Sequence, residues 1–456
     1  MTPARRAGWS PGGFGWGRGR RREGMAAVTG LLERRGVVPE DIDLLDVILR
    51  ERQVHSVFQP LVDLATESII GFEALARGPV GPLASPDRLF AAARSAGRLQ
   101  ELDELCRRTA ITGAAAAGIT APLTLFVNVE PEALDLASLA DLALLTDQTG
   151  RGPQLVLEIT ERALAFQPAE LFGAVQRLRE AGWRIALDDV GADDLSLAFM
   201  PLLRPDVIKL DMQLVQSRPD AAIAQIMNAV NAYAEQSGCL LLAEGIETRR
   251  HLAIATSLGA QVGQGWLFGK PSPVIGGAPC AQPLALPRHR AAAAAPSPFG
   301  CLPVGARLRE STKPLLIEVS KHLERQAGRL GASCLLLSTF QQGDRFSSFT
   351  ADRYHALAST VGFVGVLGEG LAAEPVAGVR GAHLPPDDPV VQEWDVIVLA
   401  PHFAAALLAR DLHAGTADRE RTFEFALTYH RDTVRDAAHS LMSRIQRSTP
   451  PTRPTR

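Results

Sequence analysis

The feature that most constrains this chain is an alternation of short apolar runs and helix-like segments between Ser56 and Pro273. Eight runs rich in Val, Ile, Leu and Phe end near polar residues: Val57–Leu64, Ile69–Leu75, Leu123–Val129, Leu155–Thr160, Arg184–Val190, Val207–Asp211, Leu240–Glu244 and Gln261–Phe268. Segments with helical periodicity, such as Pro168–Ala181 and Ala221–Gln236, separate most of them. Eight strands alternating with helices over about 215 residues predict a TIM-like (β/α)8 barrel.

The composition changes after the last of these runs. Residues 274–309 are rich in Pro, Ala and Gly, which is typical of a linker. Residues 310–447 then show apolar patterns that predict a smaller α/β domain. We expect its helices over Leu315–Leu330, Phe403–Leu412 and Arg419–Ile445, and strands over Ser333–Ser338 and Asp395–Leu399.

These patterns divide the chain of 456 residues, which is too long for one ordinary core. We predict a disordered N-terminal arm at 1–40, a barrel with a leader helix (Asp41–Arg52) at 41–273, and a disordered tail at 448–456. The arm begins with an Arg-, Gly- and Trp-rich stretch that lacks the apolar region of a signal peptide. Two interpretations remain open, a basic arm that binds an anionic partner and a true translation start at Met25.

Bulk properties exclude several classes of protein. The net charge of −3, from 47 basic and 50 acidic residues, gives no reason to expect nucleic acid or an anionic membrane as a partner. No run of about 18 apolar residues occurs, so we expect no membrane span. The five cysteines are scattered without a CxxC pair, which favours a reducing, cytoplasmic location over a zinc site or a disulfide framework.

Polar side chains stand at the ends of the predicted barrel strands, where the catalytic residues of such barrels lie. They are Glu73, Asn128, Glu158, Asp188, Asp189, Lys209, Glu244 and Gln264. Five carboxylates at one barrel mouth would repel each other, and oxygen-liganded Mg²⁺ or Mn²⁺ would remove that repulsion. Two such ions can hold a phosphodiester and activate a water molecule. A single acid at a strand end is more simply a helix N-cap or a solvated turn, but the complete set favours a metal site.

The motifs around these residues follow one known order. They are Glu73-Ala74-Leu75-Ala76-Arg77 (ExLxR), Asn128-Val129-Glu130-Pro131, Glu158-Ile159-Thr160-Glu161 (ExTE), Asp188-Asp189-Val190-Gly191, Lys209-Leu210-Asp211 (KxD), Glu244-Gly245-Ile246-Glu247 (EGxE) and Gln264-Gly265-Trp266-Leu267-Phe268 (QGxxF). In this series the chain resembles the EAL family of cyclic di-GMP phosphodiesterases. The resemblance implies hydrolysis of cyclic di-GMP to linear pGpG with two Mg²⁺ or Mn²⁺ ions, and a homodimer formed through the barrel.

The resemblance also implies a role for each position. The implied metal ligands are Glu73, Asn128, Glu158 and Asp188, with Asp189 on the second ion. Glu244 is the implied general base, Lys209 lies beside the attacking water, and Gln264 orients metal-bound water. The implied substrate contacts are Gln59, Leu75 and Arg77, and the implied loop anchors are Glu161 and Glu247.

One loop departs from the family pattern. The family reads DDFGTGYSS after the aspartate pair, whereas this chain reads Asp188-Asp189-Val190-Gly191-Ala192-Asp193-Asp194-Leu195-Ser196. The aromatic positions are lost, and we interpret Asp193 and Asp194 as a solvated turn or helix N-cap rather than extra ligands. The alternative function is therefore a catalytically weak or inactive cyclic di-GMP receptor that signals to a protein partner.

The second domain resembles the DICT type of sensory domain. The resemblance rests on Ser338-Thr339-Phe340-Gln341, Trp394-Asp395-Val396-Ile397-Val398-Leu399, Pro401-His402-Phe403-Ala404 and Phe423-Glu424-Phe425. It implies that this domain regulates the barrel in response to a signal. The isolated His402 and His430 are interpreted as structural rather than as metal ligands.

Overall fold

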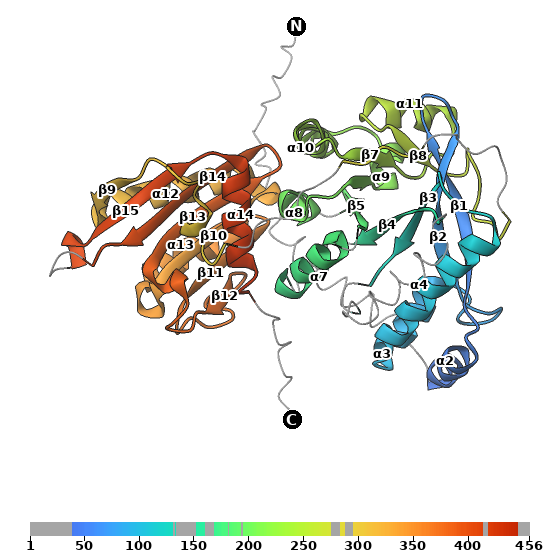
Figure 1. Cartoon of the computed structure of the whole chain (residues 1–456), viewed down its shortest axis with the longest axis horizontal. Coiled ribbons are helices and arrows are strands. Elements are labelled where there is room, and N and C mark those ends of the chain that lie inside the picture. The colour runs from blue at the N-terminus through green and yellow to red at the C-terminus, as the bar shows by residue number, and fades with distance from the viewer. Residues whose placement is uncertain are drawn as a thin grey trace, which may run out of the picture.

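The computed structural model describes residues 39–130, 133, 152–159, 168–180, 182–192, 195–274, 283–287, 295–413 and 418–445. They form a barrel and a second domain built on an open sheet (Figure 1). The predicted tail and all but the last two residues of the predicted arm lie outside the described residues, as do Asp193 and Asp194.

The first domain is a closed eight-stranded barrel, which confirms the predicted TIM-like fold. Its strands are β1 (His55–Asp63), β2 (Ile69–Arg77), β3 (Thr124–Asn128), β4 (Gln154–Ile159), β5 (Arg184–Val190), β6 (Val207–Leu210), β7 (Leu240–Ala243) and β8 (Val262–Gln264). Strand β1 is antiparallel to both of its neighbours, β2 and β8, while the other pairs are parallel. The barrel therefore begins with a β-hairpin, and the regular βα alternation follows it.

Helices surround the barrel (Figure 1). They are α2 (Pro39–Glu51), α3 (Pro86–Ser95), α4 (Leu99–Ala116), α7 (Pro168–Glu180), α8 (Leu195–Leu203), α9 (Met212–Gln216), α10 (Ala221–Ser237) and α11 (Arg249–Ser257). Local signals set several of their ends. Asp220 caps α10 by accepting a hydrogen bond from the Ile223 amide, and Gly238 ends it with φ of 72°, a conformation that glycine adopts without a steric cost.

The interior of the barrel below its mouth is filled by large apolar side chains. Leu61, Phe126, Val156 and Leu242 belong to one buried cluster there. Leu284 and Leu286, which fall in the predicted linker, pack against this cluster, and the carbonyl of Pro287 accepts a hydrogen bond of 2.9 Å from Arg184 Nη1. Part of the segment predicted as a linker is thus held against the barrel.

The second domain is a seven-stranded mixed sheet in the order β12-β11-β10-β13-β14-β15-β9, which confirms the predicted α/β class. Its strands are β9 (Arg309–Thr312), β10 (Leu335–Gln342), β11 (Phe363–Glu369), β12 (Arg380–His383), β13 (Glu393–Ala400), β14 (Phe403–Asp411) and β15 (Thr422–Thr428). Its α-helices are α12 (Lys313–Leu330), α13 (Ser348–Ala358) and α14 (Arg431–Met442). Short 3-10 turns are η2 (Phe299–Cys301), η3 (Gly331–Ser333), η4 (Gly343–Arg345), η5 (Pro389–Gln392) and η6 (Asp418–Glu420).

Two helix predictions in this domain are wrong. The segment Phe403–Leu412 is strand β14, and the predicted helix Arg419–Ile445 contains strand β15 before the helix α14 begins. The run from Ala404 to Ala409 has high helix propensity, but it is buried throughout between β13 and β15. A continuous apolar run does not distinguish a buried helix from a buried strand, and sheet packing overrides the local propensity here.

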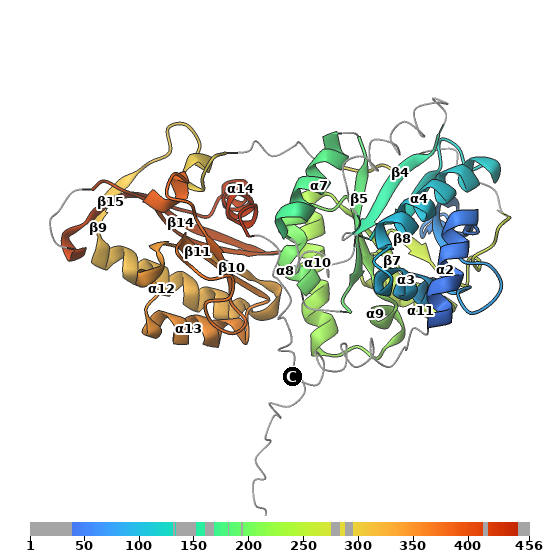
Figure 2. The ribbon, with the colours of Figure 1, turned by 90° about the horizontal axis from the view of Figure 1, so that it is seen from below.

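The two domains share one continuous apolar core. Helix α8 contacts β13, η3 and α14 of the second domain, and α7 contacts α14. The rings of Phe199 and Phe363 meet edge to face at 5.1 Å, and those of Phe172 and His439 meet at 5.2 Å. Figures 1 and 2 both show α7, α8 and α14 between the barrel and the sheet. This packing joins the domains as a core rather than as a polar surface contact.

None of the described helices is long and apolar enough to cross a bilayer. Four of the cysteines lie among the described residues, and all four are unpaired: Cys106, Cys239, Cys301 and Cys334.

Replacing Phe199 by Ala tests the shared core. Phe199 is fully buried, so Phe199→Ala should lower the free energy of unfolding by about 3–5 kcal/mol through lost burial and the cavity left behind. Phe349→Ala is the matched control, because Phe349 is 84% exposed and its loss should have little effect. Urea unfolding followed by circular dichroism measures both, and equal small losses in the two variants would contradict a shared core.

A candidate metal-assisted active site at the barrel mouth

Strand register brings the predicted site residues to one end of the barrel. Gln59 on β1 lies directly across from Glu73 on β2, and Asn128 on β3 lies across from Glu158 on β4. The chain thus presents one polar group after another around the rim. The parallel strands β2 to β8 end at the same edge of the barrel, and the antiparallel β1 begins there, so separations of tens of residues in sequence become contacts in space.

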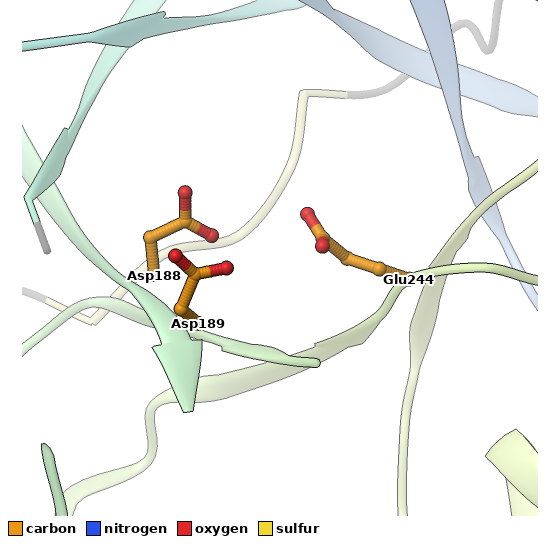
Figure 3. A group of neighbouring side chains, drawn as sticks. All are labelled: Asp188, Asp189 and Glu244. Atoms are coloured by element: carbon orange, nitrogen blue, oxygen red, sulfur yellow. The ribbon is translucent and has the colours of Figure 1, made fainter. Parts of the chain in front are cut away.

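A bulge allows two consecutive acids to face the mouth. The pairing of β5 with β6 shifts register between Leu187 and Val190, and Asp189 has a left-handed φ of 55°. Successive side chains of a regular strand point to opposite faces, so Asp188 and Asp189 could not otherwise serve one site. Carboxylate oxygens of Asp188, Asp189 and Glu244 all lie within 4.8 Å of one another, and Figure 3 shows the three side chains converging.

The buried ammonium group of Lys209 stands among four carboxylates. Its Nζ lies 2.8 Å from Glu158, 2.8 Å from Glu244 and 3.0 Å from Asp188. Glu73 is farther away, at 3.7 Å. The Lys209 side chain is only 1% exposed, so these interactions act with little screening by solvent.

This arrangement shifts the pKa of each partner. Burial acts to lower the pKa of Lys209, but Asp188, Glu158 and the other acids outweigh it and hold the pKa well above its usual value. Burial, reinforced by the charge of Glu73, raises the pKa of Glu158 well above the ordinary range. Burial also raises the pKa of Glu244 to about 7, against the opposing effect of Lys209. One lysine therefore offsets only part of the negative charge collected here.

Amide side chains hold Glu73 in place. Asn128 Nδ2 donates a hydrogen bond of 2.9 Å to one carboxylate oxygen, and Gln264 Nε2 donates one of 2.6 Å to the other. Gln264 also donates to Gln59 Oε1 at 3.0 Å. Burial acts to raise the pKa of Glu73, yet Lys209 and these donors together keep it below its usual value. These contacts therefore favour the ionised form of Glu73.

The donor set fits divalent cations. Buried oxygens at the mouth have no hydrogen-bond partner among the described residues, including Glu158 Oε2 and Gln264 Oε1. Leaving such oxygens unpaired costs free energy that a cation would recover. Carboxylate and amide oxygens are the ligands that Mg²⁺ and Mn²⁺ prefer. The groups that could hold cations are Glu73, Asn128, Glu158, Asp188, Asp189 and Glu244.

A cavity of about 310 Å³ opens beside this cluster and shares Glu73 and Asn128 with it. Leu75 and Arg77, which continue along β2, line the cavity, as does Phe90 of α3. The Arg77 guanidinium donates a hydrogen bond of 2.8 Å to the carbonyl of Ala76. Leu75 and Arg77 thus lie next to the carboxylates without joining them.

Of the two predicted loop anchors, Glu247 is described, and it lies outside this cluster. Glu247 is exposed just before α11, where its amide donates to His251 Nδ1 at 3.3 Å. Glu161 lies outside the described residues.

An ion pair that the sequence analysis missed supports the mouth. Asp103 and Arg107 on α4 are essentially fully buried and 2.8 Å apart. Asp103 Oδ1 accepts a hydrogen bond of 2.9 Å from the amide of Glu130, two residues beyond Asn128. The available signal was a charged i, i+4 pair on the buried face of α4, beside Leu102 and Cys106. The pair holds the chain that follows β3.

Replacing Lys209 by Met tests its role as the central counter-charge. Lys209→Met should lower the free energy of unfolding by about 3–5 kcal/mol in metal-free buffer, because it leaves buried carboxylates without their partner. Mn²⁺ at about 100 times its dissociation constant should restore about 2.7 kcal/mol. Lys270→Met is the control, since Lys270 is exposed. Denaturant unfolding measures both variants, and a Lys209→Met protein as stable as the parent would contradict this role.

Known proteins resemble the barrel region in sequence. The chain is 32% identical over 236 residues to the cyclic di-GMP phosphodiesterase NbdA of Pseudomonas aeruginosa, covering 50% of this chain and 30% of that protein. It is 30% identical over 250 residues to the cyclic di-GMP phosphodiesterase RocR of the same organism, covering 53% of this chain and 64% of RocR. The chain thus spans less than two thirds of the length of these relatives.

A solved structure also aligns with this region. It is the calcium and cyclic di-GMP complex of Klebsiella pneumoniae BlrP1, with 27% identity and a TM-score of 0.44, covering 48% of this chain and 56% of that one. Residues 304–412 match the DICT domain, described as a sensory domain in diguanylate cyclases and two-component systems. Residues 43–271, half of the chain, match the EAL domain. The protein therefore belongs to the EAL-domain family, with a DICT domain following its barrel.

Proposed function

We propose that this protein hydrolyses cyclic di-GMP to linear pGpG at the barrel mouth with two divalent cations, Mg²⁺ or Mn²⁺. The observation that carries the proposal is the convergence of four carboxylates on one buried lysine, with Asp189 beside two of them, next to a cavity of about 310 Å³. The names of the relatives NbdA and RocR support the same substrate. The proposed ligands are Glu73, Asn128, Glu158 and Asp188 for one ion, with Asp189 on the other.

The chain's own residues suit a phosphodiester substrate. The proposed roles of Leu75 and Arg77 are to line the nucleotide site and to contact a phosphate, and both border the cavity beside the carboxylates. Gln59, buried below the rim, would shape the floor where it meets Gln264. A planar guanidinium fits phosphate oxygens with paired hydrogen bonds.

For the chemical step, bound cations would supply charge neutralisation at the phosphodiester and a reactive water. Glu244 is the proposed base that takes a proton from this water, and its raised pKa of about 7 suits proton transfer near neutrality. Lys209, 2.8 Å from Glu244, would position that carboxylate and stabilise negative charge that develops on the phosphoryl oxygens.

We also propose that the second domain regulates the barrel through α8. This helix follows the bulged segment that carries Asp188 and Asp189 after only a few residues, and it packs against β13 and α14. A shift of the second domain would therefore act on the helix adjoining two proposed ligands. A homodimer through the barrel remains a prediction. Because the second domain covers α8, the dimer interface would use a face of the barrel other than the α8 face.

Turnover is tested with purified protein, Mg²⁺ or Mn²⁺ and cyclic di-GMP. The parent should produce pGpG, and Glu73→Ala should reduce the rate by more than about 100-fold, beyond the loss typical of residues that only support a metal ligand. Glu67→Ala is the control, because Glu67 is an exposed acid paired with Arg249. Chromatography of the products measures the rates. Tight binding of cyclic di-GMP without product in either metal would favour the receptor function instead.

Coupling between the domains is tested by a wedge at Ala198. A Cβ added to Gly362 of the second domain would lie 3.0 Å from the Cβ of Ala198 on α8, so the two domains are in close contact there. Ala198→Leu should displace the second domain and change the rate of hydrolysis several-fold, with a loss of about 1–3 kcal/mol in stability. Ala253→Leu is the matched control on the exposed side of α11. An unchanged rate in a folded Ala198→Leu protein would count against coupling.

A further inference from the structure

The second domain contains a cavity of about 390 Å³ that the barrel chemistry does not use. It lies between helices α12 and α13 and the face of the sheet formed by β10 and β13, elements that adjoin in Figure 1. Pockets for small molecules occupy about 300–1,000 Å³ and combine apolar walls with a few polar groups. The cavity has the size and position of a ligand site enclosed within one domain.

Aromatic and aliphatic side chains form much of its wall. Phe340, Tyr354 and Trp394 line it, with Ile317 and Val396 beside them. Phe340 and Tyr354 pack edge to face at 5.6 Å, which fixes the orientation of both rings. Such a surface favours the flat apolar body of an aromatic molecule.

A buried hydroxyl in this wall lacks a partner. Ser320 on α12 is 6% exposed, and its Oγ has no hydrogen-bond partner among the described residues. Its neighbours Ser338 and Tyr354 are satisfied, because the Tyr354 hydroxyl lies 2.7 Å from Ser338 Oγ and donates to Glu324 at 3.0 Å. An unpaired buried hydroxyl is destabilising, and a ligand that forms a hydrogen bond with it would remove that cost.

The polar part of the cavity carries more positive than negative side chains. Four cations, Lys313, Lys321, Arg345 and Arg353, line it with three acids, Glu324, Asp344 and Asp418. Two of the cations already pair with these acids, Arg353 with Glu324 and Lys313 with Asp418.

The other two cations are less committed. Lys321 pairs with Glu318, which is 64% exposed, so solvent screens that pair. Arg345 donates to Gln341 Oε1 at 3.1 Å and lies 3.9 Å from Asp418. Both remain available to an incoming anion.

The backbone of the cavity wall is irregular where these groups meet. The pairing of β10 with β11 shifts register between Thr339 and Gln342, and Gln341 has a left-handed φ of 58°. A bulge of this kind re-aims side chains, and bulges are common beside functional sites. Here it places Gln341 in the cavity wall next to Arg345.

From these observations we infer that the cavity binds a small aromatic organic anion, such as an aromatic carboxylate or sulfonate. The aromatic body lies against Phe340 and Trp394, the Ser320 hydroxyl makes one hydrogen bond, and the acidic group faces Lys321 and Arg345. Val396 and Trp394 belong to β13, which also contacts α8 of the barrel. Strand β13 therefore lies between the cavity and α8, the helix that follows Asp189.

Direct binding to the full chain tests the inference, independently of hydrolysis. The probes are 8-anilinonaphthalene-1-sulfonate, indole-3-acetate and the uncharged N-phenyl-1-naphthylamine, measured by calorimetry and fluorescence. At least one of the two anions should bind with one-to-one stoichiometry. Lys321→Glu should weaken binding of that anion at least about tenfold, because the substitution reverses a charge that faces the acidic group of the ligand. Arg325→Glu, an exposed reversal on the same helix outside the cavity, should leave it unchanged.

A second variant separates the cavity from the surface charge. Ser320→Leu should fill the cavity and abolish binding of the anion, and also of N-phenyl-1-naphthylamine if the parent protein binds it. Lys321→Glu should leave binding of this uncharged probe unchanged. Circular dichroism confirms that each variant is folded. Saturable binding of neither anion, or equal weakening by Lys321→Glu and Arg325→Glu, would overturn the inference. If the parent protein binds the aromatic anion but does not hydrolyse cyclic di-GMP, that result would count only against the proposed phosphodiesterase activity.

Discussion

The barrel mouth depends on the interaction of one buried ammonium group with the carboxylates around it. Lys209 lies within 3.0 Å of Glu158, Asp188 and Glu244, and no other described cation shares that position. Removing carboxylates from water is expensive unless they are paired, so the lysine makes this concentration of acids tolerable. One ammonium group among four carboxylates leaves negative charge uncompensated. That residual charge is what the proposed divalent cations would balance.

The same stretch of chain serves the site and the joint between the domains. Strand β5 ends in the bulge that turns Asp188 and Asp189 together, and α8 begins a few residues later. The described side chains of α8 are buried, among them Phe199 against Phe363 of the second domain. The core that stabilises the joint thus continues from the rim of the barrel. This shared packing supports the proposed coupling between the two domains.

Much of the fold and of the candidate site was predictable from the sequence, and the predictions that failed did so for physical reasons. The eight apolar runs predicted the barrel because buried parallel strands need continuous Val, Ile and Leu. The motif residues predicted which groups gather, since the ends of parallel strands meet at one rim. The strand β14 was missed because its Ala- and Leu-rich run has the local character of a helix and becomes a strand only between β13 and β15. The Asp103–Arg107 pair was missed because two charges one turn apart are ordinarily a surface pair.

By itself, the sequence determined the fold class of the barrel, the identity of the groups around its mouth and the position of a second domain. Those properties follow from local periodicity and from residue types at strand ends. Only the tertiary structure decided the bulge at Asp189, the depth at which Lys209 is buried, the joining of α8 to the second domain and the unpaired hydroxyl of Ser320 in its cavity. Each of these depends on groups distant in sequence sharing one low-dielectric space, and local patterns do not encode which distant groups those are.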